Sequence, residues 1–185
     1  MEQTDPRHLL IEITKILNRL KIPHIVTGGM AVFVWGRPRF TADIDIIVEF
    51  REKNIKPLVQ ELAKLDEFGY VDEKMMQEAL FKKGEFNYIH TETGVKVDFW
   101  VLKNNPFGKS CLRRQISKKI LGQKVSFISP EDLILSKLNW YKRGGSARHL
   151  EDIESILKIS KVDVRYINKW AKQQSTTEIL KEVLN

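Results

Sequence analysis

Three aspartates in this chain stand where they could do chemistry on phosphate groups. Asp43 and Asp45 are two residues apart within an Asp-Ile-Asp-Ile stretch, and Asp98 lies between two hydrophobic residues. Side chains two apart along a β-strand point to the same face, so Asp43 and Asp45 are expected side by side. Close carboxylates in apolar surroundings repel each other and lose hydration. A divalent cation removes that penalty, and Mg²⁺ prefers such oxygen ligands.

The three acids converge if the strands that carry them are neighbours in one sheet. Three carboxylates can hold two metal ions about 3.5–4 Å apart, an arrangement that serves phosphoryl transfer. The sequence therefore predicts a site for two Mg²⁺ ions at Asp43, Asp45 and Asp98, with Mn²⁺ as the alternative ion. The other interpretation places single acids on a solvated strand face. The apolar run at residues 46–48 argues against it for the first two acids, because it indicates a strand buried on both faces.

A glycine pair, Gly28-Gly29, precedes these acids and separates an apolar strand at 24–27 from a short helix at 30–35. Glycine permits a tight turn and lets a phosphate approach the backbone. The amides at the start of the following helix favour an anion. Such a pair is more often a plain turn, and the paired acids on the next strand are what favour a phosphate-binding turn.

The elements that must position these residues follow from hydrophobic periodicity and from capping signals. Asp5 and Pro6 begin the first amphipathic helix, and Ser129 and Pro130 begin the first helix of the C-terminal part. Residues 144–146 separate that helix from the next one. We expect helices at 6–21, 54–66 and 73–81, strands at 43–50, 86–91 and 95–102, and a hairpin of 115–121 with 124–128. The predicted division is an α/β core at 1–128 and a helical region at 129–185.

The composition is that of an ordinary globular protein with a basic surface. Of 185 residues, 42% are hydrophobic and 30% are charged, and the net charge is +7. Positive charge favours polyanionic partners such as nucleotides or RNA, although lysine-rich surfaces are common. A single cysteine, Cys111, excludes a disulfide within the chain. No apolar run approaches the ~20 residues of a membrane helix, and the N-terminus is acidic rather than signal-like. We therefore expect a cytoplasmic protein that does not contact membranes.

These motifs resemble a known family. Gly28-Gly29, the short helix and the stretch 43–46 resemble the signature of the DNA polymerase β-like nucleotidyltransferase superfamily, with Asp98 at the place of its third acid. Thr27 is less apolar than usual before the glycines. A looser similarity, to small AbiEii toxin-like and related bacterial and archaeal nucleotidyltransferases, involves the segments 37–41, 130–137 and 148–153. The resemblance implies an α+β fold in which a small mixed sheet is flanked by helices and followed by a C-terminal helical bundle.

The resemblance also implies an activity, with a nucleoside triphosphate as donor and Mg²⁺ as cofactor. Asp43 and Asp45 would hold the metals, while Gly28 and Gly29 would hold the β- and γ-phosphates. Asp98 would bind the second metal and activate an acceptor hydroxyl, to which a nucleoside monophosphate passes with release of pyrophosphate. The resemblance does not fix the acceptor. The positive net charge of the chain favours RNA, in particular a tRNA end, over a protein or a small molecule. The AbiEii-like branch adds a toxin–antitoxin partner protein as a further alternative.

Three cations are candidates for contact with the triphosphate, namely Arg37, Arg39 and Lys137. The alternative is that they are solvated surface cations. Arg148 and Asp152 lie four residues apart on a predicted helix and are expected to pair with each other.

The tryptophans are expected in packing, and stacking of a base on the pair 140–141 is the less favoured reading. The competing function is a non-catalytic nucleotide-binding or RNA-binding regulatory protein that keeps the fold. A protein that only binds nucleotide has no need of Asp98, and the presence of Asp98 therefore argues against the nucleotide-binding form of this alternative.

Overall fold

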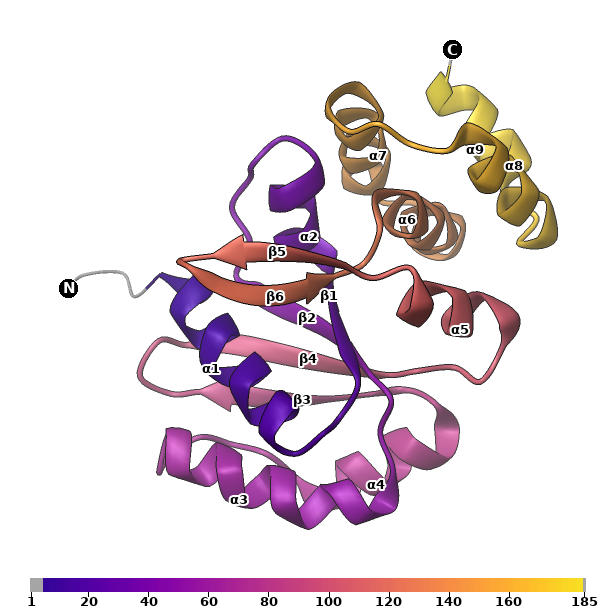
Figure 1. Cartoon of the computed structure of the whole chain (residues 1–185). Helices are drawn as coiled ribbons and strands as arrows, with labels where there is room; N and C mark the ends of the chain where they lie inside the picture. Colours follow the sequence, from indigo (N-terminus) through magenta and orange to yellow (C-terminus); the bar gives the residue numbers. More distant parts are fainter. Residues whose placement is uncertain (1–4, 185) are drawn as a thin grey trace.

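A computed structural model describes residues 5–184 and contains a six-stranded mixed sheet (Figure 1). The strand order is β3-β4-β2-β1-β6-β5. The pairs β2–β4 and β1–β6 are parallel, and the other neighbours are antiparallel. The strands are β1 (His24–Thr27), β2 (Asp43–Val48), β3 (Glu85–His90), β4 (Val95–Val101), β5 (Ile116–Ile120) and β6 (Gln123–Phe127). The predicted α+β fold with a small mixed sheet is confirmed.

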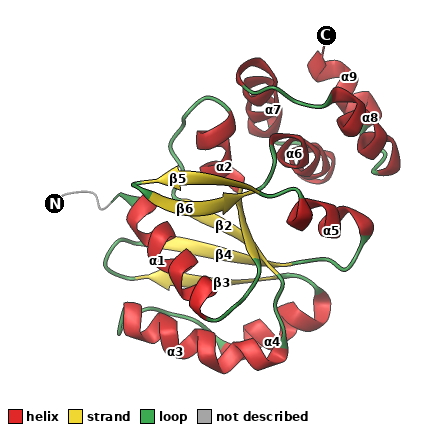
Figure 2. Ribbon diagram, in the orientation of Figure 1, coloured by secondary structure: helices red, strands yellow, loops and turns green. Residues whose placement is uncertain are grey.

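Helices surround this sheet, and those that follow the last strand gather as one group towards the C-terminus (Figure 2). The helices are α1 (Pro6–Arg19), α2 (Gly28–Trp35), α3 (Ile55–Leu65), α4 (Glu73–Lys82), α5 (Pro106–Arg113), α6 (Pro130–Gly144), α7 (Ala147–Ile159), α8 (Val164–Gln173) and α9 (Thr177–Leu184), with a short 3-10 helix η1 (Glu52–Asn54) before α3. None of the helices within residues 5–184 is both long enough and apolar enough to span a membrane.

The helix starts follow from the capping signals in the sequence. The Asp5 carboxylate accepts the backbone N–H of Arg7 at 2.9 Å, and Ser129 accepts that of Asp132 at 3.2 Å. Each such cap contributes about 1 kcal/mol by satisfying an N–H that has no partner inside the helix. The same signal begins α5, where Asn105 accepts the N–H of Gly108 at 2.7 Å, and the sequence interpretation missed it.

Strands β2 and β4 have one apolar and one polar face. On β2 the buried side chains are Ile44, Ile46 and Val48, and the residues between them are half-buried. Ile47 is one of these, so the prediction that residues 46–48 are buried on both faces is wrong. Strand β4 continues the apolar face through Val95, Val97, Phe99 and Val101. Full burial of such a side chain stabilises the fold by about 1.5–3 kcal/mol. The remaining face is free for chemistry.

Candidate active site

The polar face of β2 and β4 carries all three aspartates. In the parallel β2–β4 pair, Asp45 is directly opposite Asp98, and Asp43 is opposite Lys96. Residues in register on neighbouring strands share a face of the sheet. We call the face formed by Asp43, Asp45, Lys96 and Asp98 the acid face. The two strands are neighbours, as the sequence analysis required for the acids to converge.

Asp45 lies in an unfavourable environment for a charge. Burial raises the pKa of its carboxyl above the usual range, and repulsion from Asp98 and Asp43 adds to the rise. A hydrogen bond from Trp100 and the charge of Lys137 lower the pKa in part. The Trp100 Nε1–H donates to Asp45 Oδ1 at 3.3 Å, which fixes the position of one oxygen. A cation bound at Asp45 would therefore relieve both the desolvation and the repulsion.

Lys96 is a charged member of the acid face that the sequence interpretation missed. Its Nζ lies 2.8 Å from Asp98 Oδ2, and this hydrogen bond, with the charges of Asp98, Asp43 and Glu85, raises the pKa of Lys96. The signal was available, because Lys96 is two residues before Asp98 on a strand and so must share its face. With Asp98 bound to Lys96, no three His, Cys, Asp or Glu side chains within residues 5–184 lie close enough together to hold a metal ion.

The donor set nevertheless fits magnesium. Three carboxylates on one sheet face supply hard oxygen ligands, and the charge of Asp45 is disfavoured by its surroundings. Asp43 and Asp45 would hold the ion, and Asp98 could join them after its pair with Lys96 opens.

Gly28 lies against the Asp45 carboxylate. It has a positive φ of 61°, a conformation that only glycine adopts readily. A Cβ placed on Gly28 would come within 1.8 Å of Asp45 Oδ2, so no side chain fits there. Helix α2 begins at this glycine, and the side chain of its N-cap residue Thr27 makes no capping hydrogen bond. The first turn of α2 therefore presents backbone N–H groups next to the acids, a position that suits a phosphate.

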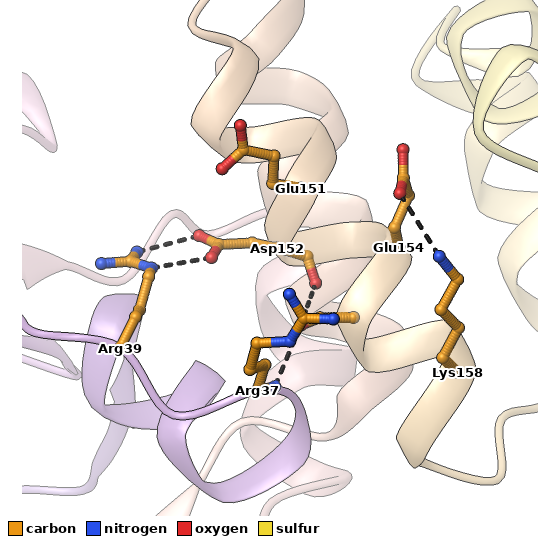
Figure 3. A pocket seen from close by; sticks show the side chains of 7 residues that line it. Arg37, Arg39, Glu151, Asp152, Glu154 and Lys158 are labelled. Atoms are coloured by element: carbon orange, nitrogen blue, oxygen red, sulfur yellow. Dashed lines mark hydrogen bonds and ion pairs between the residues drawn. The ribbon is translucent and has the colours of Figure 1, made fainter.

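Two of the predicted phosphate-binding cations are tied to a buried acid. The Asp152 carboxylate accepts Nζ of Lys137 at 2.7 Å, and it also accepts Arg39 at 2.7 Å through Nε and at 2.9 Å through Nη2. The Lys137 and Asp152 side chains are 7% and 4% exposed. Figure 3 shows Arg39 of the 37–42 loop reaching the Asp152 side chain on α7. We call Arg39, Lys137 and Asp152 the buried ion triad.

The predicted pairing of Arg148 with Asp152 is wrong. Arg148 Nη2 donates instead to the backbone oxygen of Phe40 at 3.1 Å. Asp152 is turned inward, towards α6 and the 37–42 loop, whereas Arg148 is exposed. Arg37 is exposed too, and its backbone N–H donates to Ser155 Oγ at 3.1 Å.

The two cations of the buried ion triad interact electrostatically with Asp45. Burial lowers the pKa of Lys137, and the hydrogen bond and the charge of Asp152 oppose that effect. The charge of Asp45 raises the pKa of both Lys137 and Arg39, which shows that the two cations lie within its electrostatic reach. Contact of these cations with a triphosphate stays a prediction.

Aromatic side chains form a second link between the acid face and the C-terminal helices. The rings of Trp100 on β4 and Trp140 on α6 have their centroids 5.1 Å apart, and Trp140 meets His149 edge-on at 5.7 Å. Trp140 is 39% exposed, so part of its side chain remains accessible to solvent. The predicted packing role of the tryptophans fits these contacts.

Replacing Asp152 by Asn should destabilise the protein strongly. The change leaves Lys137 buried without its counter-ion, and removal of one partner of a buried pair costs about 3–5 kcal/mol. Urea unfolding at neutral pH measures the loss. The matched control is Glu154→Gln, which removes an exposed i,i+4 pair with Lys158 at 3.6 Å and should cost less than about 1 kcal/mol. Equal unfolding free energies for the two variants would contradict the structural role of the triad.

The pH dependence of the stability that Asp152 contributes follows from the direction of its pKa shift. Burial raises the pKa of Asp152, but the hydrogen bonds and the charges of Arg39 and Lys137 together outweigh burial and hold that pKa below its ordinary 3.8. A lowered carboxyl pKa contributes stability above the unfolded-state pKa. The difference between wild type and Asp152→Asn should therefore shrink as the pH falls from 3.8 through the lower folded-state value.

Sequence comparison identifies the class of protein that this fold and site define. Residues 7–183 match the family described as "Nucleotidyl transferase of unknown function (DUF2204)", and the chain belongs to that family. It is an enzyme of the nucleotidyltransferase class. No curated protein matches the chain in sequence.

Solved structures share the fold over nearly the whole chain. The antibiotic-resistance factor ANT(2'')-Ia is 15% identical with a TM-score of 0.65, and 97% of each chain is covered. An antigenic nucleotidyltransferase-like protein from Paracoccidioides brasiliensis is 20% identical with a TM-score of 0.59, covering 98% of this chain and 93% of that one. The lincosamide adenylyltransferase LnuA is 16% identical with a TM-score of 0.56, covering 85% and 98%. The narrower AbiEii-like resemblance is not tested by these matches and stays a prediction.

Proposed function

We propose that this protein is a Mg²⁺-dependent enzyme that transfers a nucleoside monophosphate from a nucleoside triphosphate to a hydroxyl group and releases pyrophosphate. The observation that carries the proposal is the register of Asp45 opposite Asp98, with Asp45 packed against Gly28 at the start of α2. This arrangement joins a carboxylate cluster to a phosphate-binding helix start. Membership of a nucleotidyltransferase family supports it.

Each residue has a distinct part in the proposed reaction. Gly28, Gly29 and the first amides of α2 hold the β- and γ-phosphates, while Arg39 and Lys137 add positive charge. Asp43 and Asp45 hold magnesium, which when bound neutralises charge on the phosphates.

Asp98 releases Lys96 and accepts the proton of the acceptor hydroxyl. The hydroxyl oxygen then forms a bond to the α-phosphorus, and the bond between that phosphorus and the pyrophosphate oxygen breaks.

RNA is the acceptor that we favour, because the chain carries a net charge of +7. A small hydroxyl compound is the second candidate, since ANT(2'')-Ia is described with adenylyl-2''-tobramycin and LnuA with lincomycin. A protein acceptor, and a regulatory protein that binds nucleotide without turnover, are the remaining alternatives.

Labelled nucleoside triphosphates can reveal donor and acceptor together. The purified chain is incubated with each labelled triphosphate, with Mg²⁺ or Mn²⁺, and with tRNA, total protein or aminoglycosides in turn. We expect metal-dependent transfer of label to RNA, matched mole for mole by pyrophosphate. Chelation of the metal should abolish both signals. If the protein releases pyrophosphate from none of the triphosphates under any condition, the catalytic proposal fails. A thermal shift with triphosphate and metal would then distinguish a nucleotide-binding protein from an RNA-binding module.

A further inference from the structure

A basic cleft lies at the far end of the two strands that carry the acids. It is a cavity of about 530 Å³ between the end of the β2–β4 pair, the end of α4 and helix α5. Five cations line it, and Glu49 is the only acid in its lining: the cations are Arg51, Lys83, Lys103, Lys109 and Arg113. We call this the basic cleft. None of its residues belongs to the proposed catalytic set.

The backbone holds these cations together. The N–H of Leu102 donates to Val48 O at 2.8 Å, and the N–H of Val101 donates to Gly84 O at 2.9 Å. These bonds fix the three segments that carry Arg51, Lys83 and Lys103 beside one another. Helix α5 lies close against the same loop, because a Cβ on Gly108 would lie 2.4 Å from the backbone oxygen of Lys103. The backbone positions that carry the charges are therefore held near one another.

Most of this charge has no counter-ion in the protein. Arg51 pairs with Glu49 at 3.1 Å, but the other four cations make no ion pair with any residue in the range 5–184. All five are exposed. Like charges gathered around one cavity repel each other, and a bound polyanion removes that repulsion. Half-buried Leu102 and Leu112 add apolar surface to the cleft, which suits a ligand that also carries sugars or bases.

The cleft lies beyond the acid face along the direction of β4. Leu102 follows Asp98 by four residues, one residue past the end of β4 at Val101, and at about 3.3 Å per residue the separation along the chain is about 13 Å. A nucleic-acid strand of a few nucleotides spans that distance. Its terminal hydroxyl can then sit at Asp98 while its preceding phosphates lie among Lys103, Lys109 and Arg113.

We propose that the basic cleft binds the phosphate backbone of a single-stranded RNA acceptor and delivers its terminal hydroxyl to Asp98. This inference rests on the proposed function and adds to it a binding site for the acceptor. Several unpaired cations gathered around one cleft favour a chain of phosphates, whereas a polycationic acceptor would be repelled by them.

The test measures binding of a labelled single-stranded RNA oligonucleotide by fluorescence anisotropy, without nucleotide, over a series of salt concentrations. The cleft variant is Lys103→Gln, Lys109→Gln, Arg113→Gln. The control is Lys161→Gln, Arg165→Gln, Lys169→Gln, which removes the same residue types and the same charge from exposed positions, two of them likewise i,i+4 on a helix. Thermal melting checks that both variants fold.

We expect the cleft variant to bind RNA at least about tenfold more weakly and the control variant to bind as wild type does. For single strands the salt slope changes by about 0.7 per phosphate contact, so the cleft variant should lose about 2 units of slope. Equal affinities and slopes in the two variants would overturn the proposal, as would an absence of RNA binding by wild type. Binding of an acidic peptide, and not of RNA, at the cleft would overturn it as well.

The same proteins separate this inference from the proposed function. If the cleft variant loses RNA binding but wild type releases no pyrophosphate from any triphosphate, the cleft assignment stands and the catalytic proposal fails. If wild type transfers nucleotide to a small hydroxyl compound and the cleft variant binds RNA as tightly as the control variant does, the catalytic proposal stands and the cleft assignment fails.

Discussion

The variant Asp98→Asn is expected to lose about 100- to 10,000-fold in turnover, the range that a positioned general base contributes. An amide cannot take the proton of the acceptor hydroxyl. The change also removes the charge that Lys96 binds at 2.8 Å in the structure. Binding of triphosphate should remain measurable, because Gly28, Gly29 and Asp45 are untouched. Pyrophosphate release under saturating triphosphate gives the turnover, and a thermal shift with triphosphate and Mg²⁺ gives the binding.

Glu85→Gln is the matched control for this variant. Glu85 is an exposed carboxylate on the neighbouring strand β3, opposite Trp100 in the register, and it has no part in the proposed reaction. Its charge acts on Lys96 and Asp98 without a hydrogen bond to either, so its replacement should leave turnover within about threefold of wild type. Wild-type turnover in Asp98→Asn would remove Asp98 from the mechanism.

The second large effect is expected from Asp45→Asn, in both activity and stability. Loss of a metal-holding carboxylate removes several kcal/mol of transition-state stabilisation, on the order of 1,000-fold in rate. The free energy of unfolding without metal should rise, although activity falls. The reason is that an amide carries no charge to bury, while its oxygen can still accept a hydrogen bond from the Trp100 N–H. A gain of 1 kcal/mol raises the melting temperature by about 2–4 °C in a protein of about 150–250 residues.

The pH dependence of this gain follows from the raised pKa of Asp45, which burial causes first and the neighbouring acids increase. The folded state binds the Asp45 proton more tightly than the unfolded state does. The contribution of Asp45 to stability is therefore greatest below its ordinary pKa of 3.8 and is lost as the pH rises through the raised folded-state value. The stability gain in Asp45→Asn should be present at neutral pH and vanish in acid.

Magnesium completes the test. It should raise the melting temperature of wild type and have less effect on Asp45→Asn, since the variant lacks a ligand. Asp66→Asn is the contrasting control, because the Asp66 carboxylate accepts backbone N–H groups of Thr91 at 2.6 Å and Phe68 at 3.0 Å and its replacement should lower the melting temperature. A melting temperature for Asp45→Asn below that of wild type, without metal at neutral pH, would contradict the charge-burial argument.

The local patterns of the sequence predicted the sheet and its acids well. Alternation in 43–48 and 95–101 placed Asp43, Asp45 and Asp98 on strands, and the glycine pair marked the start of α2. These features depend on neighbours within a few residues, where side-chain periodicity and turn chemistry decide the structure. That the two strands are adjacent was a condition of the prediction, because spacing alone does not establish it, and the register of β2 with β4 meets that condition.

The long-range contacts could not be predicted in this way. Arg39 and Asp152 are separated by 113 residues in the chain, and nothing local indicates that they meet. The i,i+4 spacing of Arg148 and Asp152 favoured a pair on one helix, yet two partners inside the fold bind the buried carboxylate more closely than an exposed arginine can. Lys96 was missed for another reason, since a lysine on a half-buried strand usually points its charge to solvent.

The predicted boundary at 128–129 does not mark a point at which the two parts of the chain could be exchanged with those of relatives. Asp152 from the last third of the chain balances the charge of Arg39 in the first third, and Trp140 supports the ring that orients Asp45. A chimera that took its sheet from one homologue and its C-terminal helices from another would bring together an arginine and a carboxylate whose charges and positions do not match, close to the acid face. Variation in the two halves should accordingly be coupled at these few positions and independent elsewhere.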